Sequence, residues 1–202
     1  MSYHITRLFG GAWFLLLAVV TAISATQFET PTQLIARACV VILYVMFGSL
    51  ILLRTAPKSQ TYDFLPRCMA FIGSYMPWMI SFSPKTDFAL ANLLSPIFVI
   101  CGITLAVISL VHLKTAFSLV PQARSVVRSG PYRWLRHPLY VSEEIAVVGV
   151  LLQHLAPFTV LIVAVHIAVQ IGRIQYEERL LGETFPHYRM LSANWRLVPF
   201  VY

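Results

Sequence analysis

Six apolar segments dominate this sequence, and they constrain its fold more than any other feature. A helix that crosses the hydrocarbon core of a bilayer needs about 20 mainly apolar residues, because its backbone polar groups must bond to one another there. Hydrophobic residues make up 58% of the chain and charged residues only 11%, which does not suit a water-soluble domain. The segments cover residues 8–26, 34–53, 68–83, 88–113, 138–154 and 156–173. We therefore predict an all-α, polytopic membrane protein with five to six transmembrane helices.

Two of these segments are weaker than the rest. The run at 68–83 is short and contains Pro77, and the run at 138–154 is apolar for only about 10 residues after Glu144, so it crosses the bilayer obliquely or only in part. The last two segments are predicted to form a helical hairpin that turns at His154–Pro157.

The first segment also has features of a signal peptide. Arg7 precedes its apolar run, and Ala22–Ser24 is a small-x-small site. The run is long for a signal peptide, and its removal would disturb the charge asymmetry of the chain, so we favour a membrane span.

The basic residues predict the orientation in the membrane. If the N-terminus is cytoplasmic, only Arg37 and Lys85 lie on the opposite side. The other thirteen of the fifteen Lys and Arg lie on the cytoplasmic side: Arg7, Arg54, Lys58, Arg67, Lys114, Arg124, Arg128, Arg133, Arg136, Arg173, Arg179, Arg189 and Arg196. This positive-inside bias places both termini in the cytoplasm. It also accounts for most of the net charge of +7, so no nucleic-acid partner is predicted.

The composition divides the chain into two regions. Residues 1–113 consist of transmembrane helices, and residues 114–202 combine a basic loop, an apolar hairpin and a polar tail. Cys39, Cys68 and Cys101 are far apart in sequence and lack metal-ligand spacing, so we predict packing roles for them and no metal site. The chain has no GxGxxG, Walker A, HExxH or GxSxG motif, which excludes the familiar nucleotide-binding and hydrolase sites.

The loop before the hairpin concentrates Arg, His, Tyr and Trp around the Gly130–Pro131 turn. Pro138 suits the first turn of a helix, so His137 is predicted at its cap and Tyr140 one turn further on. An interfacial belt that only anchors the helices is the alternative interpretation. Glu143 and Glu144 favour a functional site, because a charge inside an apolar segment costs about 3 kcal/mol.

A second charged cluster follows the last apolar segment. Arg173 and Glu177 are four residues apart and share a helix face, while Glu178 points about 100° away from Glu177. A surface ion pair worth a few tenths of a kcal/mol is the alternative. Five of the six histidines receive no predicted role: His4, His112, His154, His166 and His187.

These motifs, taken in order, resemble those of the isoprenylcysteine carboxyl methyltransferase family. The resemblance covers about 65 residues at the C-terminal end of the chain; the first 110 residues are similar only in having membrane helices. The matching elements are Gly130-Pro-Tyr-Arg133, Arg136-His-Pro-Leu-Tyr140, Glu177-Glu178, Phe185 and Tyr188.

The resemblance implies an integral membrane enzyme that uses S-adenosylmethionine, bound in a cytoplasmic pocket built from the last helices, their loop and the C-terminal tail. It implies that Arg173 binds the substrate. The implied cofactor contacts are Arg124, Ser125, Val126, Val127, Tyr132, His137, Pro138, Leu139, Tyr140 and Glu177. The sequence departs from the family pattern at Arg124 and at Phe185–Pro186, where the family commonly has Phe-Gly.

The expected acceptor is a lipophilic molecule that enters from the bilayer, first of all the carboxylate of a prenylcysteine-like lipid. A carboxylate nucleophile needs no general base, and Arg173 would position it. A phospholipid head group or a small amine or thiol is the alternative, and an amine would need a base such as Glu144. A non-catalytic transporter is the alternative from another class; the clustering of charges at one membrane face disfavours it.

Overall fold

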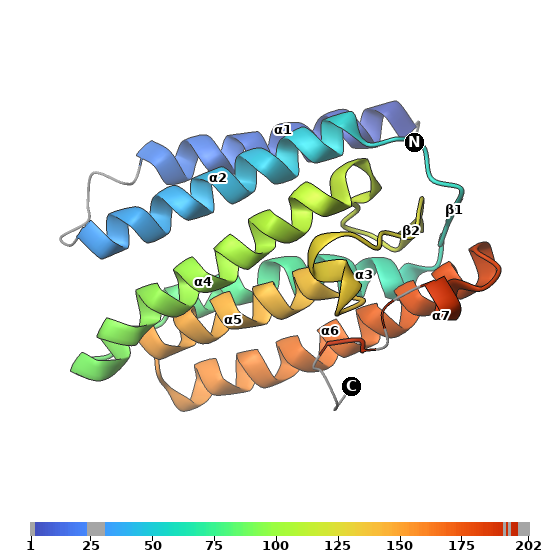
Figure 1. Cartoon of the computed structure of the whole chain (residues 1–202). Coiled ribbons are helices and arrows are strands. Elements are labelled where there is room, and N and C mark those ends of the chain that lie inside the picture. The colour runs from blue at the N-terminus through green and yellow to red at the C-terminus, as the bar shows by residue number, and fades with distance from the viewer. Residues whose placement is uncertain (1–2, 24–30, 192, 194, 198–202) are drawn as a thin grey trace.

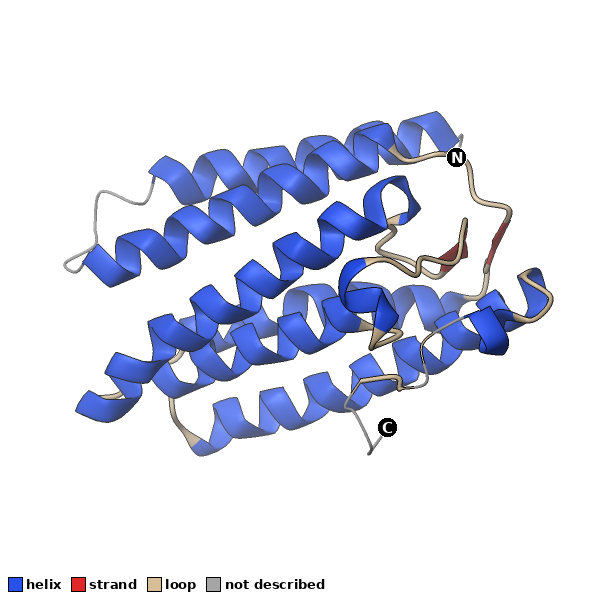
Figure 2. Ribbon diagram, in the orientation of Figure 1, coloured by secondary structure: helices blue, strands red, loops and turns tan. Residues whose placement is uncertain are grey.

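The computed structural model describes residues 3–23, 31–191, 193 and 195–197, and it shows helices lying side by side along one direction (Figures 1 and 2). The α-helices are α1 (Tyr3–Ile23), α2 (Pro31–Leu53), α3 (Phe64–Tyr75), α4 (Ala89–Leu113), α5 (Pro138–Gln153), α6 (Pro157–Thr184) and α7 (Tyr188–Leu191). Within the described residues, three 3-10 helices accompany them: η2 (Met76–Phe82), η3 (Lys114–Ala116) and η4 (Gly130–Arg133). The strands β1 (Ser59–Gln60) and β2 (Gln122–Ala123) pair antiparallel. The predicted all-α class is therefore confirmed, with this small sheet as an addition.

Four of the described helices are long and apolar enough to cross a membrane. These candidate spans are His4–Ile23, Leu34–Leu53, Ala89–Ala116 and Pro157–Thr184. The other two predicted segments form shorter helices. The third becomes α3 followed by η2, where Pro77 occupies the first turn of the 3-10 helix, and the fifth becomes α5, which has 16 residues.

The helical hairpin turns where the sequence predicts it. His154 ends α5, and Pro157 occupies the first turn of α6. The Thr159 hydroxyl accepts a hydrogen bond from the backbone N–H of Ala156 at 3.0 Å and donates to the carbonyl of His154 at 2.6 Å. These bonds satisfy backbone groups that a helix end would otherwise leave unpaired.

Helix α6 is longer than its apolar segment. The helical spacing of Arg173, Glu177 and Glu178 predicts a helix into the polar tail, and the helix continues to Thr184. The added residues include Gln, Glu, Arg and Leu, which are good helix formers, and the helix ends just before Pro186. The charged cluster therefore lies on a rigid element.

Small residues bring α4 and α5 together. A Cβ at Gly102 would lie 2.5 Å from the backbone nitrogen of Ala146, and one at Gly149 would lie 2.8 Å from the carbonyl oxygen of Ser95. Such close backbone contact is a common way for membrane helices to associate. The predicted packing role fails for Cys101, which is exposed on α4, while Cys39 and Cys68 are half-buried.

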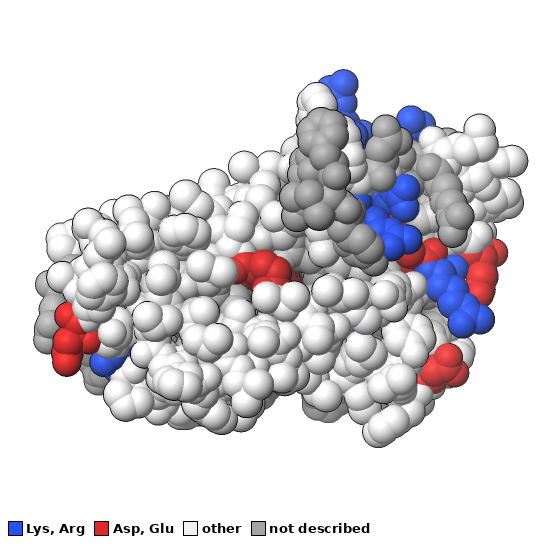
Figure 3. All heavy atoms as spheres, turned by 90° about the horizontal axis from the view of Figure 1, so that it is seen from below, with Lys and Arg blue, Asp and Glu red and all other residues white. Residues whose placement is uncertain are grey.

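The loops divide between two ends of the bundle. Figure 1 shows that α1 begins, and α2, α4 and α6 end, at the end that also holds β1, β2 and η4. Lys and Arg side chains gather at one end of the face seen in Figure 3. This arrangement agrees with the positive-inside pattern; the cytoplasmic location of that end stays a prediction.

Candidate active site

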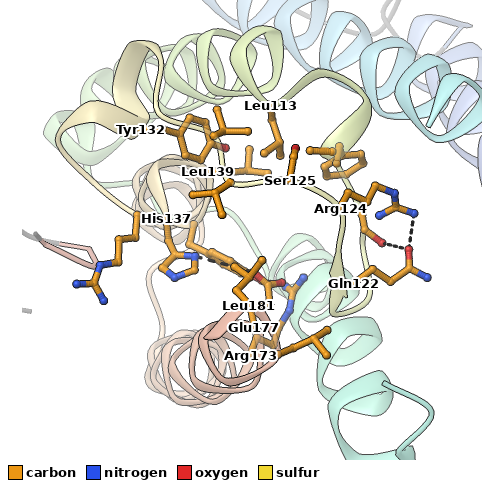
Figure 4. A pocket seen from close by; sticks show the side chains of 18 of the residues that line it. Leu113, Gln122, Arg124, Ser125, Tyr132, His137, Leu139, Arg173, Glu177 and Leu181 are labelled. Atoms are coloured by element: carbon orange, nitrogen blue, oxygen red, sulfur yellow. Dashed lines mark hydrogen bonds and ion pairs between the residues drawn. The ribbon is translucent and has the colours of Figure 1, made fainter. Parts of the chain in front are cut away.

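A cavity lies at the end of the bundle that holds β1, β2 and η4. Its space measures about 1020 Å³ with the open mouth included. Figure 4 shows Arg173 and Glu177 of α6 on one side and Tyr132, Leu139 and Ser125 on the other. All but one of the predicted site residues line it: Arg124, Ser125, Val126, Val127, Tyr132, His137, Leu139, Tyr140, Arg173 and Glu177. Pro138 is buried in the first turn of α5 and is not part of the lining.

The Gly130–Pro131 turn folds the loop against α4. Gly130 has a φ of 56°, and a Cβ there would lie 2.5 Å from the His112 ring, so a residue without a side chain is required. The turn leads into η4 and buries Tyr132. Burial, followed by the carboxylates of Glu177 and Glu143, raises the pKa of Tyr132 above its ordinary value. Its hydroxyl therefore stays protonated at neutral pH.

The start of α5 places His137 and Tyr140 beside Glu177. His137 caps the helix with Pro138 in the first turn, as predicted. The Tyr140 hydroxyl donates to Glu177 Oε1 at 2.5 Å, and His137 Nδ1 lies 3.9 Å from Glu177 Oε2. The two rings meet edge to face at 5.7 Å between centroids. This geometry contradicts a purely interfacial belt, because both side chains are buried and turned inward.

Arg173 is 4% exposed, so it does not take part in a surface ion pair. Its Nη1 donates to Gln170 Oε1 at 2.7 Å, and its Nη2 donates to the carbonyl oxygen of Leu119 at 3.2 Å. The guanidinium also lies 5.0 Å from the centroid of the Tyr140 ring. Its Nε is buried and has no hydrogen-bond partner within the described part of the chain.

Glu178 lies outside the cavity lining, as its helix position predicts, and its Oε1 lies 3.4 Å from His137 Nε2. Its carboxylate pairs with Arg136 at 3.2 Å and with Arg196 at 2.8 Å. The backbone of this loop is also bonded to the tail, because the N–H of His137 donates to the carbonyl of Arg196 at 3.1 Å. Glu178 therefore fastens the tail over the loop, while Glu177 faces the cavity.

Arg124 supports the cavity wall. It is buried, and its Nε donates to the carbonyl of Thr55 at 2.8 Å while its Nη2 donates to Gln122 Oε1 at 2.5 Å. These bonds connect the segment after α2 to β2. The departure from the family pattern at this position thus has a structural role beside any cofactor contact.

A row of polar residues on α6 extends from the predicted pair Arg173 and Glu177 to Gln170 and His166, which were not predicted. Glu143 Oε2 accepts a hydrogen bond from Gln170 Nε2 at 2.7 Å, and Glu144 Oε1 lies 3.1 Å from His166 Nδ1. The signal was present in the spacing. His166, Gln170, Arg173 and Glu177 follow one another at intervals of four, three and four residues, which is one face of a helix.

One comparison with known proteins bears on this region. Residues 90–187 match the family model described as phospholipid methyltransferase. No curated protein matches the chain. The matched family belongs to the isoprenylcysteine carboxyl methyltransferase-like group of integral membrane methyltransferases. The resemblance seen in the sequence is therefore confirmed at the level of this group. A membrane methyltransferase requires a methyl donor.

Proposed function

We propose, on the premise that this region is an integral membrane methyltransferase, that the chain uses S-adenosylmethionine and methylates the head group of a membrane lipid. The residues around the cavity support this donor. Its sulfonium is cationic, and the cavity offers the carboxylates of Glu143 and Glu177 and the aromatic rings of Tyr132 and Tyr140. When bound, the cofactor supplies an electrophilic methyl group.

The proposed binding residues divide between the loop and the two helices. Residues 124–127 and the segment from His137 to Tyr140 would hold the adenosyl moiety. Glu177 has carboxylate oxygens that accept hydrogen bonds, as the bond from Tyr140 shows, so it suits the ribose hydroxyls. The loop, fastened to the tail through Glu178, limits access of water to this side.

The pairing of opposite charges in one cavity carries the proposal for the acceptor. Arg173 and Glu143 both line it, and Gln170 is bonded to both side chains. A phospholipid with an amine head group carries a phosphate and an ammonium group, which complement these charges. The buried Nε of Arg173 has no hydrogen-bond partner within the described residues, and an anionic oxygen of the acceptor would supply one. A phospholipid also agrees with the description of the matched family.

The carboxylate of a prenylcysteine-like lipid is the second candidate. The same Arg173 Nε favours it, and a carboxylate is nucleophilic without deprotonation. In this case Glu143 would lie beside a second negative charge, which is unfavourable unless a proton or cation compensates for it. The acceptor's lipid tail would enter from the bilayer in either case.

We also propose that both termini are cytoplasmic. A protease-sensitive tag at either end is expected to be cleaved only from the cytoplasmic side in intact cells or spheroplasts. A single cysteine introduced near Lys85 in a cysteine-free variant is expected to react with a membrane-impermeant reagent only from the opposite side. Cleavage of the tag and labelling of the cysteine from the same side of the membrane would overturn this topology.

The acceptor is tested with purified protein in nanodiscs and S-adenosylmethionine that carries a labelled methyl group. One sample contains a phospholipid with an ethanolamine head group, and another contains a prenylcysteine analogue. Label on the phospholipid supports the first candidate, and label on the analogue alone supports the second. Transfer to neither, without binding of S-adenosylhomocysteine, would contradict the proposed function.

A further inference from the structure

A histidine and a glutamate meet inside the apolar part of the bundle, outside the cavity lining. His166 is 1% exposed, and its Nδ1 lies 3.1 Å from Glu144 Oε1. Its Nε2 lies 2.9 Å from the carbonyl oxygen of Gly73 in α3. The contact therefore joins α5, α6 and α3. A charged pair in a membrane span is costly, and such residues commonly have a function.

These distances determine the protonation of the pair. A carbonyl oxygen only accepts hydrogen bonds, so His166 Nε2 must carry the hydrogen that points to Gly73. A neutral imidazole then has only a lone pair at Nδ1, which faces a carboxylate oxygen. The contact at 3.1 Å is favourable only if one proton lies between the two atoms. The structure thus has the geometry of a pair that holds one proton and no net charge.

The pair is next to the cavity and close to the lipid-facing surface. Glu144 follows Glu143, which lines the cavity, and His166 is one helical turn, about 6 Å, before Gln170. The Glu144 side chain is 25% exposed, yet both of its oxygens are buried and Oε2 has no hydrogen-bond partner within the described residues. The methylenes of Glu144 thus face outward while its carboxylate turns inward.

We propose that the Glu144–His166 pair is the proton acceptor for an ammonium-bearing lipid head group; this inference rests on the proposed function. An ammonium nitrogen has no lone pair and cannot accept a methyl group. In the proposed step one N–H bond of the ammonium breaks, its electron pair stays on nitrogen, and the proton binds between Nδ1 and Oε1. The head group then presents a neutral amine.

The charges favour this step in a membrane. The unprotonated pair has a charge of −1 and the ammonium a charge of +1, so both become neutral when the proton moves. No isolated charge is created in a medium of low dielectric constant. The proton must leave for water before the next turnover.

Polar groups from α5, α6 and α3 surround the Glu144–His166 pair. From α5, Glu143 faces the same region, and its Oε2 is bonded to Gln170. From α6, Arg173 is the nearest cation along the helix face and is also bonded to Gln170. From α3, the Gly73 carbonyl contributes a dipole that holds His166 in one tautomer. Glu144 is therefore the carboxylate in direct contact with the histidine.

The test compares Glu144→Gln and His166→Asn with the wild type in nanodiscs that contain the ethanolamine phospholipid. Loss of a general base typically costs about 100-fold or more, so turnover at neutral pH is expected to fall by about that factor. The affinity for S-adenosylhomocysteine is expected to stay within about threefold. Raising the pH increases the fraction of free amine and is expected to restore much of the lost turnover in both variants. A purely structural role for the pair predicts no such recovery.

The controls distinguish a failure of the proposed proton acceptor from a failure of the proposed lipid substrate. Glu183→Gln removes a carboxylate from an exposed ion pair with Arg179 and is expected to leave turnover and its pH profile unchanged. If Glu144→Gln does not fold, Glu144→Asp and His166→Asn carry the test. Wild-type turnover and pH profile in a folded Glu144→Gln variant would overturn the inference alone. A wild type that binds S-adenosylhomocysteine but does not methylate the amine lipid would instead overturn the proposed acceptor.

Discussion

The α1–α2 hairpin and the α5–α6 hairpin are both pairs of membrane helices, but their interiors differ. Phe14, Leu17, Phe47 and Ile51 form the centre of the first, where Phe14 and Phe47 pack with their ring centroids 5.2 Å apart. Between α5 and α6, the contacts include Glu143 with Gln170, Glu144 with His166 and Tyr140 with Glu177. Both pairs start from apolar sequences.

The buried polar contacts of the second hairpin distinguish it from the first. An apolar interface between membrane helices needs only shape complementarity. Buried polar groups require a partner for each atom, and the second hairpin keeps several of them in spite of that cost. Substitutions in the α5–α6 hairpin should therefore reduce turnover or cofactor binding. Substitutions in the α1–α2 hairpin should reduce stability.

The largest effect is expected at Arg173. Arg173→Lys keeps the charge but loses the planar donor group that contacts Gln170 and Leu119. Turnover is expected to fall about 100-fold through lost positioning, while affinity for S-adenosylhomocysteine changes less than about threefold. Arg179→Lys is the control, because the Arg179 side chain is 77% exposed. Equal turnover of Arg173→Lys and Arg179→Lys would mean that Arg173 only neutralises nearby carboxylates and does not position the acceptor.

A smaller effect should distinguish the two adjacent glutamates. Glu177→Gln is expected to weaken S-adenosylhomocysteine binding about 30-fold, since hydrogen bonds to a charged group contribute about 2 kcal/mol. Glu178→Gln is expected to weaken it less than about threefold but to lower the melting temperature, because it loosens the contacts with Arg136 and Arg196. Calorimetric titration and thermal melting measure both. Equal changes in affinity and in melting temperature for the two variants would contradict the placement of Glu177 and Glu178 on different faces of α6.

Next in size is the effect at the mouth of α5. Tyr140→Phe removes the 2.5 Å bond to Glu177, and His137→Ala removes the ring beside it. Each is expected to weaken S-adenosylhomocysteine binding about 10-fold without unfolding the protein. Tyr62→Phe is a matched control at a side chain that is 75% exposed. Unchanged affinity in both site variants would restore the interfacial-belt interpretation.

The smallest effect on the site is expected from the first hairpin. Phe14→Leu removes aromatic volume from the α1–α2 interior, so the melting temperature should fall by several degrees. S-adenosylhomocysteine affinity should stay within about twofold. A loss of affinity as large as that of Tyr140→Phe would show that the two hairpins are coupled and would contradict their expected independence.

Local patterns predict the parts of this molecule that local forces decide. The turn at His154–Pro157, the cap at His137 and the separation of Glu177 from Glu178 all follow from proline placement and helical spacing. Helical spacing predicts α6 as far as Glu178 but not to Thr184, because hydropathy ends where the apolar residues end, while helix propensity continues.

Long-range contacts lie beyond such patterns. Nothing in the sequence around Gly73 indicates that a Cβ there would lie 2.9 Å from Arg173 Nη1, or that its carbonyl meets His166. The pairing of β1 with β2 joins residues far apart in the chain. These contacts depend on which helices become neighbours, and that is decided by the whole bundle.

The most direct test is a calorimetric titration of purified protein in detergent with S-adenosylhomocysteine. We predict saturable binding of about one molecule per chain. Glu177→Gln is expected to weaken this affinity about 30-fold, and Phe14→Leu is expected to change it by less than about twofold. No binding to a folded wild type, or equal weakening by both substitutions, would contradict the assignment of the cavity as the methyl-donor site.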